Sequence, residues 1–490
     1  MRDQDSIKVN EVAIVKGPTP QDSVTKGIKL LGGITKFIEE GDQIFIKFNL
    51  NLPFGYPTNT NFELLKSLIE SCNMAGASKV YLGSFPAEGT SIKAISDLLN
   101  LKGFFENFGA ELAFLDKSDF FYGRKIKEDE AERIKSEFFL SVKVNGKDFL
   151  IPKIIIHSDK FISVNQVNVN PLFKLNLSLF NSYSIISPKY QRIKAKDSND
   201  DIYLQTDQYK KDLISNILQV FSLKQPDLVI NDMFYLLDNA GPNIYKDSEL
   251  KKIGIVILGN NAVSVDAITL KMVNLDILSY DLVVEAQKKK LGNYDLQKIN
   301  LYGEDPEDFI INVEFCKSKL EDIKLKNFNI KCGQYCSGCY AQAYDLLNFM
   351  KSHMTKDLKY NPCNTFLIGK NPLEPSLFKN IIIFGDCAIE STKDGNFRKI
   401  SKQSDKIIVG DIINPKNEKK KTRKEPKIKL KTNKNILELP GCPPDINDSL
   451  NLIFKYYGRN NTPNLTIYRS ILESWKTPKL KEKLKILEII

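Results

Sequence analysis

Five cysteines in the last third of the chain have spacings that suit metal chemistry. They are Cys332, Cys336, Cys339, Cys387 and Cys442. The second and third form a C-x-x-C pair, and the last two stand in the short motifs Gly-Asp-Cys-Ala and Pro-Gly-Cys-Pro-Pro. The chain starts with polar residues, so we expect no signal peptide. In a protein without secretory features, clustered cysteines favour a metal site over disulfides.

The elements predicted around these cysteines bring them together. The last two cysteines each follow a predicted strand directly, and the C-x-x-C pair opens a predicted helix. In a parallel sheet, strand-to-helix junctions gather at the carboxyl edge, so we expect the thiols to converge there. Four thiolates suit a cubane [4Fe–4S] cluster, to which a C-x-x-C turn contributes two. Four thiolates also suit zinc, and the spacing leaves that alternative open.

In this order, the three motifs resemble the cluster-binding small subunit of nickel–iron hydrogenases and its counterpart in respiratory complex I. The resemblance implies one [4Fe–4S] cluster that relays electrons, with four ligands: Cys336, Cys339, Cys387 and Cys442. The chain departs from that family where Glu390-Ser-Thr replaces a Gly-Gly pair, and where a basic insertion separates the last two motifs.

Cys332 creates a second spacing, C-x3-C-x2-C, which is also the spacing of radical-SAM enzymes. No barrel-sized sequence follows it, so we discount that family. Three interpretations of Cys332 remain: a spare thiol, an alternative ligand or a core residue.

The first 305 residues alternate between short apolar strands and helices, with glycines between them. This pattern predicts an α/β domain with a largely parallel sheet. A smaller α/β unit, flavodoxin-like in kind, is expected to carry the cysteines. The expected strands are 11–15, 43–47, 79–82, 153–156, 160–164, 227–230, 254–258, 365–368, 380–384, 406–409 and 436–439, and the expected helices are 24–40, 62–74, 340–353 and 448–457.

Several stretches of this first region resemble the domain-of-unknown-function 362 family. They are Leu31–Ile34 with Gly41–Asn49, Ala75–Gly83, Ile230–Asp232 with Ala240–Pro242, Gly259–Ala267 and Leu291–Glu304. The family occurs in many anaerobic prokaryotes, is often fused to ferredoxin-like cluster modules, and implies no settled activity. Where it usually has a Lys-x-His stretch, this chain has Asn165-Gln-Val-Asn-Val-Asn170, which weakens a catalytic assignment.

Four polar residues of the first region are candidates for binding a ligand. Lys47 and Asn49 leave the end of a buried strand, a position favoured for ligand contact. Asp232 and Asp266 could line the same cleft, and a lysine with carboxylates suits an anionic small molecule or acid–base chemistry. A snorkelling Lys47, a capping Asn49 and a helix N-cap at Asp266 explain the same residues. The catalytic residues stay unassigned.

The length of 490 residues predicts more than one domain. We expect a first domain over 1–305, a connector over 306–331, an iron–sulfur module over 332–470 and a helical tail over 471–490. A basic insertion, 415–434, lies within the module.

The formal net charge of +10 comes mainly from that insertion. It holds ten Lys or Arg against Glu418 and Glu425, a local net of 10 − 2 = +8. It has no aromatic residue for base stacking, so we expect a solvated segment and no nucleic-acid binding, with an anionic partner left open. No apolar run reaches the ~18 residues of a membrane-spanning helix, and we expect a cytoplasmic protein without membrane insertion.

Together these features predict an iron–sulfur redox protein. In it, a domain that binds an anion or another small molecule is coupled to a [4Fe–4S] electron relay. An oxidoreductase component is one interpretation of such a chain. The alternative is a zinc-stabilised or cluster-carrying scaffold that docks a partner. The sequence identifies neither the redox partner nor the small molecule.

Overall fold

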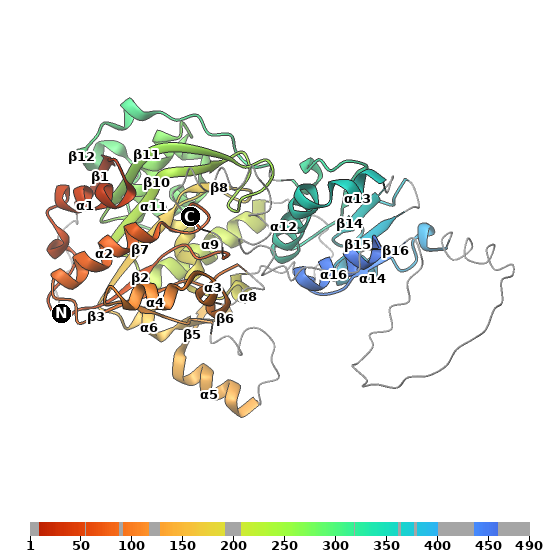
Figure 1. Cartoon of the computed structure of the whole chain (residues 1–490), viewed down its shortest axis with the longest axis horizontal. Helices are drawn as coiled ribbons and strands as arrows, with labels where there is room; N and C mark the ends of the chain where they lie inside the picture. The colour runs from red at the N-terminus through yellow and green to blue at the C-terminus, as the bar shows by residue number, and fades with distance from the viewer. Residues whose placement is uncertain are drawn as a thin grey trace. The chain divides into compact units, whose positions relative to one another are not determined.

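The computed structural model describes residues 9–53, 55–87, 92–116, 128–191, 207–317, 319–360, 364–376, 380–399 and 436–458. These residues form two compact units, and the chain passes from the first to the second at residues 318–319. Figure 1 labels most of the helices and strands of the two units. The predicted strand 406–409, the basic insertion 415–434 and the tail 471–490 lie outside the described residues.

An eight-stranded sheet forms the centre of the first unit. Its order is β12 (Ile299–Gly303), β1 (Asn10–Lys16), β11 (Glu249–Gly259), β10 (Leu228–Asp238), β7 (Lys160–Gln166), β2 (Gln43–Lys47), β3 (Lys79–Gly83) and β4 (Glu111–Leu112). The strands from β10 to β4 run parallel, β12 is parallel to β1, and β11 pairs antiparallel with both of its neighbours. The predicted fold class, α/β with a largely parallel sheet, is confirmed.

The central strands are buried on both faces, which explains why they read as continuous apolar runs. Val12–Val15, Ile44–Ile46 and Ile255–Leu258 are fully buried. Helices of the first unit pack against the sheet, with α1 on β1 and β11, and α10 on β10 and β11. The helices are α1 (Pro20–Leu30), α2 (Phe62–Met74), α3 (Ile92–Leu99), α4 (Leu101–Glu106), α5 (Glu128–Phe138), α6 (Lys153–Ile156), α7 (Ser178–Asn181), α8 (Pro188–Gln191), α9 (Asp207–Leu223), α10 (Ala262–Met272) and α11 (Asp281–Lys288).

Two short hairpins complete the strands described in the first unit. They pair β5 (Phe139–Val144) with β6 (Lys147–Pro152), and β8 (Asn168–Asn170) with β9 (Lys174–Asn176).

The second unit contains a four-stranded parallel sheet. Its strands are β13 (Phe328–Cys332), β14 (Asn364–Ile368), β15 (Ile381–Phe384) and β16 (Ile436–Leu439), and they lie in chain order. A flavodoxin-like sheet reverses its strand order at one point, whereas these four strands follow the chain. The helices are α12 (Ser337–His353), α13 (Thr355–Tyr360), α14 (Asp386–Ser391) and α16 (Ile446–Tyr456).

Two expected elements differ from the structure by more than an extension at their ends. The helix expected over 24–40 ends at Leu30, because Gly32 and Gly33 take φ values of +102° and +95° that a right-handed helix excludes. The strand expected over 153–156 is wrong. That stretch is the helical turn α6, because pairing with β5 already ends at Pro152 and leaves the apolar residues after it without a partner strand.

The expected connector 306–331 divides between the two units. Glu314 N donates to Asp238 Oδ1 at 2.6 Å, and Ile311 N donates to Met272 O at 2.7 Å, so its first part packs on the first unit. Its last part forms most of β13, the first strand of the second sheet. Across the described ranges, no helix combines the length and the apolar composition needed to span a membrane.

Candidate functional site

Four of the predicted cysteines lie at the carboxyl edge of the sheet in the second unit. Cys336 is the N-cap residue of α12, and Cys339 is buried in the first turn of that helix. Cys387 lies in the first turn of α14, directly after β15, and Cys442 follows β16. These positions come from three separate segments of the chain, and parallel pairing brings β15 and β16 side by side.

The thiols of these cysteines influence one another electrostatically. The pKa of Cys339 is raised by its hydrogen bond with Cys336, by burial, and by the charges of Cys336, Cys387 and Cys442. The pKa of Cys387 is raised by burial and then by the charges of Cys442 and Cys336. Ionising these thiols together therefore needs a compensating positive centre, and a bound metal supplies one because a coordinating thiol is deprotonated.

The backbone between these cysteines is closely packed. Gly385 has φ +91°, and a Cβ built on it would lie 3.4 Å from Cys339 Sγ and 3.8 Å from Gly441 O. Asp386 N donates to Gly441 O at 3.0 Å, and Gly441 N donates to Asp386 Oδ1 at 2.8 Å. The loops that carry Cys387 and Cys442 are thus hydrogen-bonded to each other. Gly385 has no side chain, which leaves room for the Cys339 thiol.

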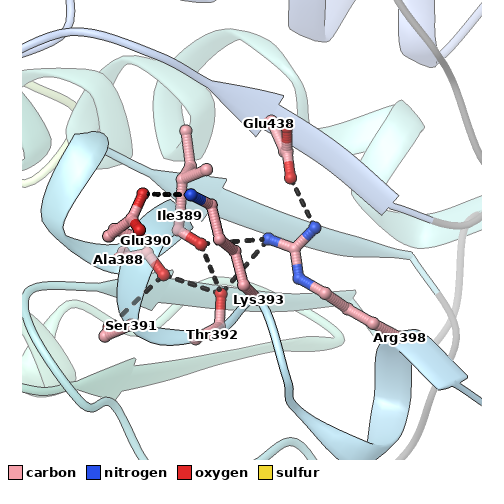
Figure 2. A network of polar contacts seen from close by, with 8 residues as sticks. All are labelled: Ala388, Ile389, Glu390, Ser391, Thr392, Lys393, Arg398 and Glu438. Atoms are coloured by element: carbon pink, nitrogen blue, oxygen red, sulfur yellow. Dashed lines mark hydrogen bonds and ion pairs between the residues drawn. The ribbon is translucent and has the colours of Figure 1, made fainter.

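A polar network holds α14 against β16, as Figure 2 shows. Arg398 Nη1 donates to Glu438 Oε1 at 2.5 Å, and its Nη2 donates to Thr392 Oγ1 at 3.2 Å. Thr392 Oγ1 in turn donates to Ala388 O at 2.6 Å. Arg398 therefore connects the end of the helix that carries one cysteine with the strand that precedes another.

The donor set matches a cluster in number and kind, because all four groups are thiols. Among the described residues, no group of three or more His, Cys, Asp or Glu side chains is arranged to hold a single metal ion. Four thiol ligands suit a [4Fe–4S] cluster and also suit zinc.

Cys332 has a different polar neighbour. It ends β13, and its pKa is raised by burial and by the charge and hydrogen bond of Glu321. A spare thiol, an alternative ligand and a core residue remain the three interpretations of Cys332.

In the first unit, Lys47 ends β2 with its side chain 1% exposed. Its ammonium donates to Asn181 Oδ1, which is its only hydrogen-bond partner within the described ranges. Burial lowers the pKa of Lys47 well below its ordinary value. Lys47 therefore does not snorkel, and a buried amine of this kind can act as a donor, a base or a nucleophile.

Asp266 lies inside α10, so the expected helix N-cap at this position is wrong, and Asn261 caps α10 instead. Asp266 Oδ1 accepts from Ser178 N at 2.9 Å and from Ser178 Oγ at 2.5 Å, and Oδ2 accepts from Leu179 N at 2.9 Å. A further hydrogen bond comes from Asn231 Nδ2 at 3.0 Å. Asp266 thus holds the N-terminus of α7, the helix whose last residue receives the lysine.

Asn49 fixes the loop that follows β2. Its Oδ1 accepts from Gln166 N at 2.8 Å, and its backbone N donates to Thr60 Oγ1 at 2.8 Å. These hydrogen bonds give Asn49 a structural role, as the capping interpretation of this residue expects.

Asp232 is fully buried near the end of the parallel part of β10. Its Oδ1 accepts from Tyr56 O–H at 3.2 Å and from Phe234 N at 2.9 Å. Burial raises the pKa of Asp232 to about 7, partly offset by these hydrogen bonds. Burial and the nearby Asp232 charge together raise the pKa of Tyr56 well above its ordinary value.

Asp232 and Asp266 do not line one cleft. Successive side chains of a strand point to opposite faces, and Asn231 points to Asp266. Asp232 therefore points to the other face, where Gln166 is its paired neighbour in β7. The two carboxylates belong to two polar clusters, one on each face of the same sheet edge.

Four polar partners escaped prediction from the sequence: Tyr56, Gln166, Asn181 and Asn231. A signal existed for two of them. Asn165-Gln166 and Asn231-Asp232 each interrupt an apolar strand, and the register pairs them residue by residue. Asn181 and Tyr56 stand outside such strands and had no signal of that kind.

Comparison with known proteins supports the resemblance of the first region to the domain-of-unknown-function 362 family. Residues 44–271 match the model of a family described as Domain of unknown function (DUF362). No curated protein matches the chain. A solved structure of the lactate racemase apoprotein from Thermoanaerobacterium thermosaccharolyticum is similar over 50% of this chain and 54% of that chain, with 10% identity and a TM-score of 0.29. The chain thus spans about half the length of that protein, and the likeness carries no conclusion about activity.

Replacing Asp266 by Asn tests its role in holding α7. The amide places an N–H₂ group where one carboxylate oxygen now accepts, so we expect the free energy of unfolding to fall by about 1–3 kcal/mol at pH 7. Burial raises the pKa of Asp266 from 3.8 to about 6, so the folded chain keeps this proton longer than the unfolded chain. Wild-type stability should therefore fall by up to about 3 kcal/mol as the pH rises from about 4 to about 6.

Urea unfolding across this pH range measures both effects. The Asp266→Asn variant should show a flatter pH dependence, and Asp276→Asn, at the cap of an exposed turn, should follow the wild type. Equal pH dependence in wild type and Asp266→Asn would refute the assignment.

Replacing Arg398 by Met tests the network in Figure 2. The side chain of Arg398 is 16% exposed and its loss leaves Glu438 and Thr392 without their donor, so we expect a loss of about 1–3 kcal/mol. The matched control is Lys393→Met, because the Lys393–Glu390 pair is 60% and 71% exposed and should contribute less than about 0.5 kcal/mol. Equal losses in the two variants, measured by urea unfolding, would contradict the structural role of Arg398.

Proposed function

We propose that this chain is an iron–sulfur redox protein whose second unit holds a [4Fe–4S] cluster. The proposed ligands are Cys336, Cys339, Cys387 and Cys442. One observation carries the proposal: three separate segments bring four thiols so close that the charges of three raise the pKa of the fourth, Cys339.

The surroundings of the thiols support this assignment. Cys336 and Cys387 lie at the N-terminal ends of α12 and α14, where the helix dipole favours a thiolate and offsets negative charge. Gly385 keeps the backbone close to Cys339 without a side chain between them. When bound, the cluster supplies one-electron transfer, and the chain's own residues hold it and set its surroundings.

For the first unit we propose a small-molecule site at the carboxyl edge of the larger sheet. Lys47 supports an anionic or carbonyl-bearing ligand, because it is a buried amine whose partner is a neutral amide. Open α/β sheets bind ligands at this edge. No residues are assigned to a reaction that would couple such a ligand to the cluster.

Anaerobic purification tests the cluster. We expect a brown protein with broad absorption near about 400 nm and about four irons per chain, and an EPR signal after reduction. Cys387→Ser and Cys442→Ser should each lower the iron content, whereas Cys316→Ser in the first unit should leave it unchanged. Colourless protein with one zinc per chain would replace the redox proposal by the zinc-stabilised scaffold.

A redox titration separates electron transfer from a structural cluster. If the cluster relays electrons, it should be reduced and reoxidised reversibly at a potential in the range of biological iron–sulfur carriers. Loss of iron on the first reduction, with no reversible signal, would contradict the relay.

A further inference from the structure

Three buried oxygen atoms of the first unit have no hydrogen-bond partner in the described part of the chain. They are Thr58 Oγ1, Gln166 Oε1 and Asp232 Oδ2. All three side chains are fully buried. A buried polar atom left without a partner costs about 1–3 kcal/mol, so several in one place indicate a missing group.

The three atoms belong to one neighbourhood. Gln166 and Asp232 are paired neighbours across β7 and β10, and Gln166 Nε2 donates to Tyr235 O at 2.8 Å. Tyr56, two residues before Thr58, donates to Asp232 Oδ1 at 3.2 Å and accepts from Tyr235 N at 3.0 Å. The loop that carries Thr58 is thus fastened beside the two strand ends.

The missing group must be positive or rich in donors. Within the described ranges, the three oxygens form no hydrogen bond with one another or with any other group. Every hydrogen bond to the Asp232 carboxylate reaches Oδ1, and within the described ranges Asp232 forms no ion pair. Burial raises the pKa of Asp232 to about 7, so a bridging water would leave an ionised Asp232 without compensation, whereas a cation would stabilise the ionised form.

We infer that the first unit binds a monovalent alkali cation between the loop at Thr58 and the ends of β7 and β10. Asp232 Oδ2, Gln166 Oε1 and Thr58 Oγ1 are its side-chain ligands. One carboxylate with neutral amide and hydroxyl oxygens balances a single positive charge. Magnesium is usually bound through one or two carboxylates together with several waters, and calcium takes 6–8 oxygens, so this buried set suits a divalent ion less well.

The cation would connect the loop at Thr58 to the sheet, and this role does not depend on the cluster. Asn168 Nδ2 donates to Pro57 O at 2.6 Å, and Asn51 Nδ2 donates to Thr58 O at 3.2 Å, so this loop is held over the sheet edge. Binding of the ion joins the loop to β7 and β10 on the face opposite Asp266. It therefore orders one side of the edge where the proposed small molecule would bind.

Thermal unfolding and hydrogen exchange of the full chain test the inference. The chain is compared in potassium, sodium and choline chloride at equal ionic strength, since choline is too large for the site. Potassium or sodium should raise the midpoint of the first unit by roughly 2–4 °C in a saturable manner, because a ligand that binds only the folded state stabilises it. Backbone amides of residues 55–60 should exchange more slowly in the same salt.

Variants assign the effect to the three oxygens. Asp232→Asn and Gln166→Met should abolish the difference between potassium and choline, and Thr58→Val should reduce it. Asp227→Asn is the matched control at the other end of β10, where the carboxylate accepts from Phe161 N at 2.9 Å, and it should keep the full difference. If Asp232→Asn does not fold, Thr58→Val and Gln166→Met carry the test.

Three results would overturn the inference. One is equal stability and equal exchange in all three salts. Another is a cation effect that persists in Asp232→Asn or Gln166→Met. The third is stabilisation by magnesium or calcium chloride but by neither potassium nor sodium. None of these outcomes depends on iron content, so the cation site and the cluster can fail separately.

Discussion

Parallel strand pairing is the constraint on which both candidate sites depend. In the second unit it sets β15 beside β16, so the residues after both strands, including Cys387 and Cys442, meet at one edge. In the first unit it sets Asn165 beside Asn231 and Gln166 beside Asp232. Side chains far apart in the sequence become neighbours because the strands before them end at the same level. A shift of one residue in either register would move these side chains to the opposite face.

Burial at these edges then decides the state of each polar group. Lys47, Asp232 and Asp266 all lie where water is excluded, and burial disfavours the charged form of each. Four hydrogen bonds to the Asp266 carboxylate offset the cost of burying it, and Lys47 has one hydrogen bond, to an amide oxygen. Asp232 Oδ2 has no hydrogen-bond partner within the described ranges. In the second unit, the thiols also resist ionisation. Several thiolates at one sheet edge repel one another unless a positive centre binds between them.

Much of this arrangement could be predicted from the sequence. Strands such as Gln43–Lys47 and the helix Phe62–Met74 have the predicted bounds, because apolar runs bounded by glycine identify buried elements clearly. The motif cysteines also lie at the sheet edge where strand-to-helix junctions placed them. What escaped prediction depended on tertiary contacts. The run Lys153–Ile156 has strand composition but no partner strand, and it forms a helical turn.

The sequence identified the candidate residues of the first unit, but it did not show that they lie on opposite faces of the larger sheet. Asp232 and Asp266 come from different elements, and only the pairing of Asn231 with Asp266 reveals which side each occupies. Asn181 and Tyr56 lie in a short helix and a loop, where composition says nothing about what a side chain touches. Periodicity finds the elements, whereas the partners of a buried polar group follow from how those elements pack.

We propose that four cysteines from three segments hold one cluster. Mössbauer spectroscopy of the chain, produced with ⁵⁷Fe and kept anaerobic, can establish this, because the spectrum reports the type of iron centre as well as its presence. We expect the quadrupole doublet of a [4Fe–4S] cluster in the wild type and its loss in Cys387→Ser. A chain without bound iron, or a spectrum of isolated iron that Cys387→Ser leaves unchanged, would contradict it.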